Sequence, residues 1–358
     1  MRTVPRSLRR KSEGDGVGAK PESLESHSAC LAAALHKRGM AFGVIRVART
    51  SGLPKEPWLT FAAAGRHWFY RHGHLRVGDT PAFAGARHIN GKTAAITTSK
   101  RATKKRLAAA GIPVAQGKVF AATDEAGALA WFERLGAAVC VKPDGGTQGQ
   151  AITTHVADRA MFEAAFARVA ADFGSIMVER MLVGEVIRVL CLDGRAVATR
   201  LDRAASVLGD GASTVAALVA AKNAVRVRRA MPGHVALNLD EDALFHLARQ
   251  GLDAAAVPGR QQRVWLRGMS HPNRGGDAVS GPPGLHRSHV GLVEEACRAL
   301  PGLRTAGYDL LVADRRRPGN AWVLEVNSSP GITFFHHPWR GPVQDVAGSI
   351  LDWLQQDA

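Results

Sequence analysis

The chain has 358 residues, of which 46% are hydrophobic, and this is enough for a sizeable core shared among two or three lobes. Its apolar runs are short and interrupted by charges, and no apolar segment follows the basic N-terminus, so we expect neither a membrane span nor a secretory signal, and a cytoplasmic location. A formal net charge of +16 indicates an anionic partner such as a nucleotide, an acidic peptide or a nucleic acid, although an arginine-rich codon bias explains the same charge equally well.

The first 22 residues are rich in Arg, Lys, Gly and Ser without periodicity, which predicts a flexible basic tail over 1–22. The following segment, 23–95, is predicted to be a short N-terminal domain. Its expected elements are a helix from 24 to about 39, a strand over 40–47 and a β-hairpin over 66–77. Ser23 or Ser26 is the expected N-cap of the helix. The hairpin is expected to turn at His72 and Gly73.

Strands and helices alternate over 96–180, which we predict to be one α+β lobe. Its first helix is capped near Thr98 or Ser99 and closed by Gly111, and Pro113 prevents its extension. The further expected elements are strand 116–120, helix 124–135, strand 138–143, strand 151–155, helix 158–173 and strand 175–180.

The segment 181–358 is predicted to be a second, larger lobe. Its first two strands are joined at Asp193 and Gly194, the best short hairpin signal in the chain. The other expected elements are helices 213–223, 241–250, 289–300 and 345–354 and strands 263–267 and 322–326. A long irregular loop is expected over 269–289, and loops of that length in compact enzymes are commonly functional.

Two oxygen-bearing side chains stand at the end of the apolar strand 322–326. Glu325 and Asn327 are two residues apart and therefore share one face of the strand. Asp309 begins another apolar run that could pair with this strand. Hard oxygen ligands suit Mg²⁺, which combines a few carboxylate or carbonyl oxygens with nucleotide phosphates. Taken singly, each of these acids fits an ordinary strand-end charge better.

A glycine-rich loop follows the strand that ends at Lys142 and Pro143. Gly145, Gly146 and Gly149 would let backbone N–H groups approach phosphate oxygens, and Lys142 would add a fixed positive charge beside them. The loop is not a Walker A motif, because no Gly-Lys-Ser/Thr sequence follows it. A glycine-rich hairpin tip without a ligand is the alternative.

The end of strand 175–180 is a candidate nucleotide-base site. Backbone groups next to Glu179 could face a purine edge, Leu182 its ring face and Glu185 a ribose hydroxyl. A solvated connection between two strands is the alternative interpretation of the same residues.

Several short motifs occur in a fixed order along the chain. They are Ser99-Lys100, Val141-Lys142-Pro143-Asp144-Gly145-Gly146, Met177-Val178-Glu179-Arg180, Gly209-Asp210-Gly211-Ala212-Ser213-Thr214-Val215, Leu266-Arg267, Gly275-Gly276, Ala306-Gly307-Tyr308-Asp309 and Leu324-Glu325-Val326-Asn327-Ser328-Ser329-Pro330-Gly331. In this order they resemble the ATP-grasp superfamily, and more narrowly the ATP-grasp region of cyanophycin synthetase and related carboxylate-amine ligases. The resemblance covers roughly residues 96 to 356.

The resemblance implies an α+β ATP-grasp fold, in which two lobes clasp ATP, with a short N-terminal domain before them. The implied ligands of the ATP phosphates are Lys100 and Lys142 with the glycines Gly145, Gly146 and Gly149; those of the nucleoside are Glu179, Leu182 and Glu185; and those of Mg²⁺, with Mn²⁺ as an alternative, are Asp309, Glu325 and Asn327. Arg267 and Lys142 would stabilise charge on the transferring phosphoryl group.

The implied reaction is the ATP-dependent joining of a carboxylate to an amine. ATP would phosphorylate the carboxylate to an acyl phosphate, and the amine would displace phosphate to give an amide or peptide bond. Two positions depart from the family pattern: Val186 stands where relatives carry the acidic ribose ligand, and His271 stands where they carry Asn. The second ATP site of cyanophycin synthetase would follow residue 358, so we expect a single ligation rather than polymerisation.

The expected partners are small amino-acid or peptide substrates, without a membrane, and a homo-oligomer is left open. The alternative function is a basic nucleic-acid or polyanion-binding protein on a degenerate ATP-grasp scaffold, which the charge of +16 motivates. An aromatic content of only 6% disfavours binding by base stacking. A third interpretation is a kinase-like enzyme that phosphorylates a small molecule without ligation.

The four scattered cysteines favour neither a zinc site nor disulfides.

Overall fold

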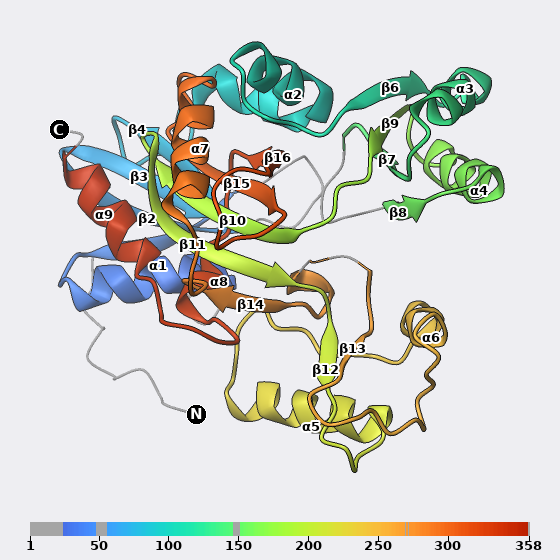
Figure 1. Cartoon of the computed structure of the whole chain (residues 1–358). Coiled ribbons are helices and arrows are strands. Elements are labelled where there is room, and N and C mark those ends of the chain that lie inside the picture. The colour runs from blue at the N-terminus through green and yellow to red at the C-terminus, as the bar shows by residue number, and fades with distance from the viewer. Residues whose placement is uncertain (1–23, 48–55, 146–150, 269, 271, 357–358) are drawn as a thin grey trace.

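A computed structural model describes residues 24–47, 56–145, 151–268, 270 and 272–356 (Figure 1). The predictions for the tail 1–22 and for Gly146 and Gly149 lie outside the described residues. The described chain forms two five-stranded sheets, one four-stranded sheet and a two-stranded ribbon. Among these residues, no helix combines the length and apolar character that a membrane span requires.

The N-terminal sheet is an antiparallel meander whose strands follow chain order. It contains β1 (Phe42–Val47), β2 (Glu56–Ala63), β3 (Arg66–Arg71), β4 (His74–Gly78) and β5 (Arg87–His88). The predicted turn at His72 and Gly73 is confirmed, because Arg71 pairs with His74. Helix α1 (Ser26–Lys37) and the last helix, α9 (Val346–Gln356), pack together against this sheet. The predicted caps of α1 are wrong: the N-cap is Glu25, whose carboxylate accepts from two backbone N–H groups of the first turn.

The central sheet is also antiparallel and has the strand order β14-β11-β10-β15-β16. Its strands are β14 (Asp277–Ser280), β11 (Arg195–Arg203), β10 (Glu185–Leu192), β15 (Thr305–Val312) and β16 (Ala321–Asn327). Helix α7 (Arg287–Arg298) covers one face and shares a hydrophobic core with it. The predicted hairpin at Asp193 and Gly194 is confirmed as the β10–β11 turn. The prediction of an irregular loop over 269–289 is wrong at β14, because these four residues form a strand that pairs with β11.

The four-stranded sheet has the order β6-β9-β7-β8, and every adjacent pair is antiparallel. It contains β6 (Gly117–Ala121), β9 (Ser175–Arg180), β7 (Val139–Pro143) and β8 (Thr153–Val156), with helices α3 (Glu125–Leu135) and α4 (Arg159–Ala170) packed on it. The 3₁₀ helix η3 (Gly91–Thr98) and helix α2 (Lys100–Ala109) precede this sheet. The predicted cap Ser99 is confirmed, because its side chain accepts from the Ala102 N–H.

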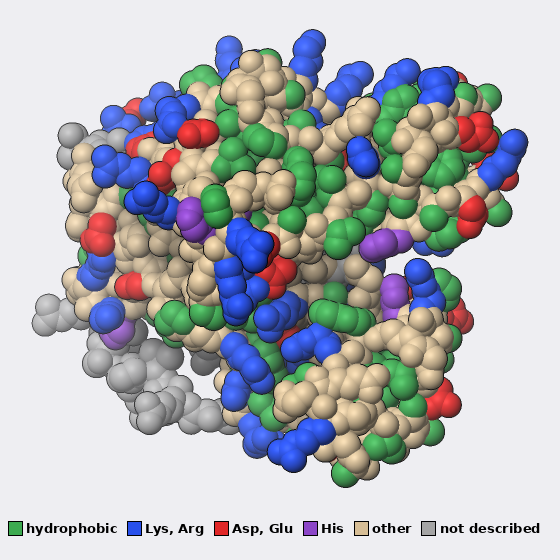
Figure 2. Space-filling model, in the orientation of Figure 1, with side chains coloured by type: hydrophobic (Ala, Val, Ile, Leu, Met, Phe, Trp, Pro, Cys, Tyr) green, Lys and Arg blue, Asp and Glu red, His purple; other side chains and the backbone are tan. Residues whose placement is uncertain are grey.

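A smaller unit surrounds the ribbon of β12 (Ser206–Leu208) and β13 (Arg263–Trp265). Helices α5 (Val215–Arg228) and α6 (Glu241–Ala248) share a core with this ribbon. The remaining elements are η4 (Pro272–Arg274) and α8 (Thr333–His336). Figure 1 shows the sheet with α3 and α4 and the unit with α5 and α6 on the same side of the central sheet. Figure 2 shows a notch in the molecular surface between these two parts.

Candidate functional site

The three predicted metal ligands share one face of two neighbouring strands. Asp309 of β15 pairs with Glu325 of β16, and Asn327 follows two residues later, opposite Gly307. The side chain of Asp309 is 17% exposed, whereas Glu325 and Asn327 are exposed. Two carboxylates and one amide oxygen on a single face form a donor set that fits Mg²⁺.

Asp309 has a cationic partner that the sequence analysis did not single out. Arg188 of β10 stands opposite Asp309 and donates to both of its carboxylate oxygens, with Nη2 2.7 Å from Oδ2. Burial by itself lowers the pKa of Arg188, but the carboxylates of Asp309, Asp202 and Glu325 raise it above its ordinary value. A fixed positive charge therefore lies beside the candidate metal ligands.

A second charged cluster joins β7, β9 and α2. Glu179 is 3% exposed, and it accepts hydrogen bonds from Lys104 and Lys142. Burial by itself lowers the pKa of Lys142, but the negative charge of Glu179, with smaller contributions from Cys140 and Glu325, raises it overall. Burial dominates for Lys104 and lowers its pKa. Glu179 therefore keeps Lys142 positively charged in a buried position.

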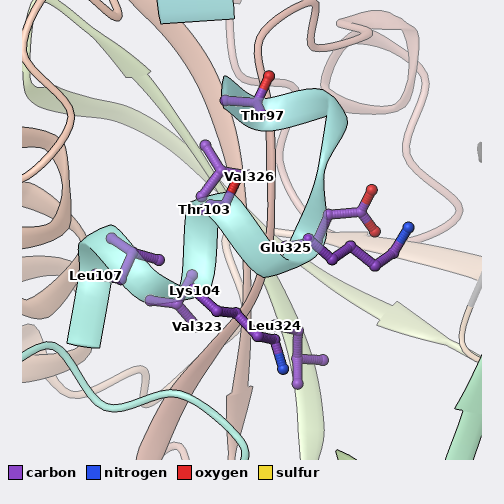
Figure 3. Close-up of a pocket in the computed structure, with 9 residues that line it drawn as sticks. Thr97, Thr103, Lys104, Leu107, Val323, Leu324, Glu325 and Val326 are labelled. Carbon is purple, nitrogen blue, oxygen red and sulfur yellow. The ribbon is translucent and has the colours of Figure 1, made fainter. Parts of the chain in front are cut away.

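Glu325 connects the two clusters. It stands opposite Asp309 in the β15–β16 pairing, and its carboxylate is among the smaller causes that raise the pKa of Lys142 and Arg188. Together with Lys100 and Lys104, Glu325 also lines a hollow between α2 and β16 with about 230 Å³ of empty space, adjoining solvent included. Figure 3 shows Lys104 reaching from α2 and Glu325 from β16. The other lining residues are Thr97, Thr103, Leu107, Val323, Leu324 and Val326.

The start of α2 is tied to the start of the glycine-rich loop. Asp144, directly after β7, accepts hydrogen bonds from the Ser99 hydroxyl at 3.0 Å and from the Arg101 N–H at 2.8 Å. The backbone N–H of Lys100 donates to the Asp144 carbonyl oxygen at 3.3 Å. These bonds hold Lys100 next to Gly145, the one loop glycine of the predicted set that the structure describes.

Two predicted site residues have other partners. The Arg267 guanidinium, beyond β13, contacts Asp240 at 2.6 Å and Asp242 at 3.3 Å, near the start of α6. Glu185 accepts from Arg315, with Nη1 2.7 Å from Oε1. It lies three residues from Arg188 on β10 and therefore on the opposite face of the strand. Leu182 is half-buried in the connection between β9 and β10.

A third group of potential metal-binding side chains is formed by α1 and the β3–β4 turn. Glu25, His27 and His72 offer ligand atoms within 4.8 Å of one another. Some of their polar atoms have protein partners: Glu25 caps α1, and Nδ1 of His27 accepts from the backbone N–H groups of Ile332 and Thr333, each at 3.0 Å. We interpret this group as a structural contact between α1 and the C-terminal part of the chain.

Comparison with solved structures shows the class of fold. The chain superposes on the crystal structure of a bifunctional glutathione synthetase from Pasteurella multocida with a TM-score of 0.65 and 24% sequence identity, covering 94% of this chain and 45% of that one. The protein has the ATP-grasp fold, as the sequence predicted, and its fold class is α+β.

Comparison with curated sequences then gives particular relatives. The chain is 33% identical over 267 residues to cyanophycin synthetase of Nostoc sp. strain PCC 7120, which covers 72% of this chain and 29% of the relative. It is also 33% identical over 272 residues to the glutathione biosynthesis bifunctional protein of Mannheimia succiniciproducens, which covers 72% and 35%. The chain thus spans about a third of the length of these relatives. No family model matches the sequence. The predicted resemblance to cyanophycin synthetase is confirmed.

Proposed function

We propose that this protein is an ATP-dependent carboxylate-amine ligase that forms an amide or peptide bond through an acyl phosphate and releases ADP and phosphate. The observation that carries the proposal is the meeting of two charged clusters at Glu325: the lysine cluster of Lys142 and the acidic face of Asp309 and Asn327. Phosphoryl transfer needs positioning and charge neutralisation rather than a protein nucleophile, and these residues can supply both. The substrates would be small amino acids or peptides, in the cytoplasm.

The residue roles follow from this arrangement. Lys100 and Lys142 would bind the ATP phosphates together with the loop glycines Gly145, Gly146 and Gly149. Asp309, Glu325 and Asn327 would hold Mg²⁺, or Mn²⁺ in its place. When bound, the metal would neutralise negative charge on the phosphate oxygens. Backbone groups next to Glu179, with the side chain of Leu182, would bind the adenine, while the Glu179 carboxylate keeps Lys142 charged.

Arg267 and Glu185 carry the least structural support among the proposed site residues. Arg267 would have to leave Asp240 and Asp242 to stabilise the transferring phosphoryl group. Arg188 already stands beside the candidate metal ligands, and we propose it as a second candidate for that role. A ribose contact by Glu185 would require release from Arg315.

The division into parts is a further proposal. We assign 1–22 to a basic tail, 23–95 to the N-terminal domain, 96–180 to the small lobe and 181–358 to the large lobe. Separate sheets in the last three segments support this division. Because α9 packs on the N-terminal sheet, the large lobe and the N-terminal domain would fold as one body.

The test is ADP release by the purified chain with ATP, Mg²⁺ and a panel of amino acids and short peptides. Release should require both a carboxylate and an amine, with an amide product detectable by mass spectrometry. Glu325→Ala should reduce the rate by about 100-fold or more, because Mg²⁺ would lose a carboxylate ligand and the reacting phosphates would lose part of their charge neutralisation. The matched control is Glu133→Ala on α3, which should retain activity. Full turnover by Glu325→Ala would refute the metal assignment, and a phosphorylated product without an amide would identify a kinase.

The charge of +16 supports the alternative of polyanion binding. Figure 2 shows Lys and Arg side chains over much of the viewed face, with acidic side chains among them. A steep fall of DNA affinity with salt concentration, without any nucleotide turnover, would favour this alternative over the ligase.

A further inference from the structure

The turn that follows β16, residues 328–333, is held along its length by the N-terminal part of the chain. The Asn90 side chain donates to the Ser328 carbonyl oxygen at 2.7 Å. A Cβ atom at Gly73 would lie 2.5 Å from the Ser329 carbonyl oxygen, so the β3–β4 turn touches the 328–333 turn directly. At its far end, the N–H groups of Ile332 and Thr333 donate to His27. Three separate N-terminal segments therefore fix the 328–333 turn.

Asn90 also fixes how β15 and β16 sit relative to one another. The residue is buried, with 2% of its surface exposed. It exchanges two hydrogen bonds with the backbone of Thr305, at 2.8 and 2.9 Å, in addition to its bond to Ser328. Thr305 begins β15, four residues before Asp309, and Ser328 directly follows Asn327. One buried amide thus joins the two strands that carry the proposed metal ligands.

A row of hydrogen bonds runs from the N-terminal sheet to the same turn. The Asn90 N–H donates to Nδ1 of His88 at 3.1 Å, which leaves the proton of a neutral imidazole on Nε2, 3.5 Å from the Ser329 hydroxyl oxygen. That hydroxyl lies 2.9 Å from Nδ1 of His74 and can donate to it. Burial, together with His74 and Arg76, lowers the pKa of His88 to about 4, so the imidazole is neutral at neutral pH.

The row ends at a proposed metal ligand. The backbone N–H of Ser329 donates to Oδ1 of Asn327 at 2.9 Å, so the position of Ser329 sets the direction of that amide oxygen. The groups behind a ligand decide its orientation, and losing them typically weakens metal binding by about 10- to 100-fold.

We propose that His74, His88 and Asn90 are positioning residues for the metal site: Asn90 holds Ser328, His74 and His88 hold Ser329, and Ser329 orients Asn327. This inference rests on the assignment of Asn327 as a metal ligand in the proposed function. It gives the N-terminal sheet a role in the reaction through the orientation of Asn327.

The experiment measures Mn²⁺ binding to the full-length protein in the presence of ADP, by electron paramagnetic resonance of free Mn²⁺. Ser329→Ala removes the hydroxyl between the two imidazoles, and His88→Ala removes one imidazole; each should weaken Mn²⁺ binding roughly 10-fold. Ser329→Thr keeps the hydroxyl and should restore wild-type affinity. The matched control is His67→Ala, on β3 of the same sheet, which should bind Mn²⁺ as the wild type does.

A second readout separates positioning from general loss of structure. ADP affinity without metal should stay unchanged in Ser329→Ala, because the lysine cluster is intact. Wild-type Mn²⁺ affinity in both Ser329→Ala and His88→Ala would overturn the inference, as would an equal loss of ADP and Mn²⁺ binding. If the wild type binds Mn²⁺ with ADP but turns over no substrate, the ligase proposal fails. The comparison of Mn²⁺ affinities still decides whether these hydrogen-bonded residues position Asn327.

Discussion

Glu179 is the residue with the most demanding environment in the candidate site. It is 3% exposed and lies between two lysines, Lys104 and Lys142. Burial by itself raises the pKa of this carboxyl, but the two lysines lower it overall, so the group stays ionised. The cluster carries one negative and two positive charges, and the surplus positive charge makes it suitable for a phosphate.

Replacing Glu179 by Gln should destabilise the protein strongly. Two buried ammonium groups would lose their common carboxylate, and breaking a buried ion pair by removing one partner typically costs about 3–5 kcal/mol. The measurement is the free energy of unfolding from urea denaturation, with Glu133→Gln on the exposed face of α3 as the control. A loss below about 1 kcal/mol for Glu179→Gln would contradict the importance of this ion pair.

Residue spacing predicted the shared face of Glu325 and Asn327, because the two-residue period of a strand is independent of what the strand pairs with. The partner of Asp309 could not be predicted in the same way. Arg188 reaches Asp309 only through the β10–β15 register, which links residues 121 positions apart. A charged residue inside the apolar run 186–192 was the available signal. The partners of Arg267 likewise depend on the placement of α6, which no motif encodes.

At the scale of elements, residue type predicted helix caps and tight turns, because these features depend on only a few neighbouring residues. Ser99 caps α2, Asp193 and Gly194 form the β10–β11 turn, and Gly73 lies in the β3–β4 turn, as their residue types predict. β14 was missed because its four residues form a strand only through pairing with β11. The cap of α1 was missed because Glu25 is an uncommon N-cap residue, which here also accepts from the His72 N–H.

The β3–β4 turn offers a test of the contact between the N-terminal sheet and the 328–333 turn. Gly73→Ala should destabilise the protein more than Gly65→Ala. Both glycines have positive φ, 80° and 69°, so both substitutions carry the left-handed strain of about 1–2 kcal/mol. At Gly65 the added Cβ meets open space, whereas at Gly73 it would lie 2.5 Å from a backbone oxygen of Ser329.

Urea denaturation of the two glycine variants and the wild type measures the difference. Gly65→Ala supplies the cost of strain alone, so the excess for Gly73→Ala reports the clash with the 328–333 turn. Equal losses of stability would show that this turn moves freely away from the N-terminal sheet, contrary to the hydrogen bonds of Asn90 and His27.

At the scale of the whole molecule, the N-terminal sheet and the C-terminal helix share one core. This core combines Leu31 of α1 and Leu59 of β2 with Leu190 of β10 and Leu351 of α9. The apolar spacing of each element could be predicted from the sequence. The packing of these elements on one another could not, because residues of this core lie up to about 320 positions apart in the chain, as Leu31 and Leu351 do. The short N-terminal segment, which lies outside the resemblance over residues 96 to 356, is therefore an integral part of the fold.

Histidines spread over the molecule link its stability to pH. Burial is the largest cause of a lowered pKa at six described histidines: His27, His88, His234, His246, His336 and His337. In the unfolded chain such groups bind protons near pH 6.5, whereas in the folded protein they bind them only at lower pH. Below about pH 6.5 the unfolded chain therefore holds more protons, and acid favours unfolding.

His88 allows one of these contributions to be isolated. Folding lowers its pKa from 6.5 to about 4, because protonation would place a charge in a half-buried position beside His74 and Arg76. Ser329, in the turn that follows β16, contacts the same imidazole. The free energy of unfolding should decrease as the pH falls through this window, by up to about 1.4 kcal/mol per pH unit for each extra proton that the unfolded chain binds. His88→Gln should make this dependence less steep when urea denaturation is measured between about pH 7 and pH 4. An unchanged slope in His88→Gln would mean that the imidazole binds its proton over the same pH range in the folded protein as in the unfolded chain, contrary to the hydrogen bond that Nδ1 accepts from the Asn90 N–H.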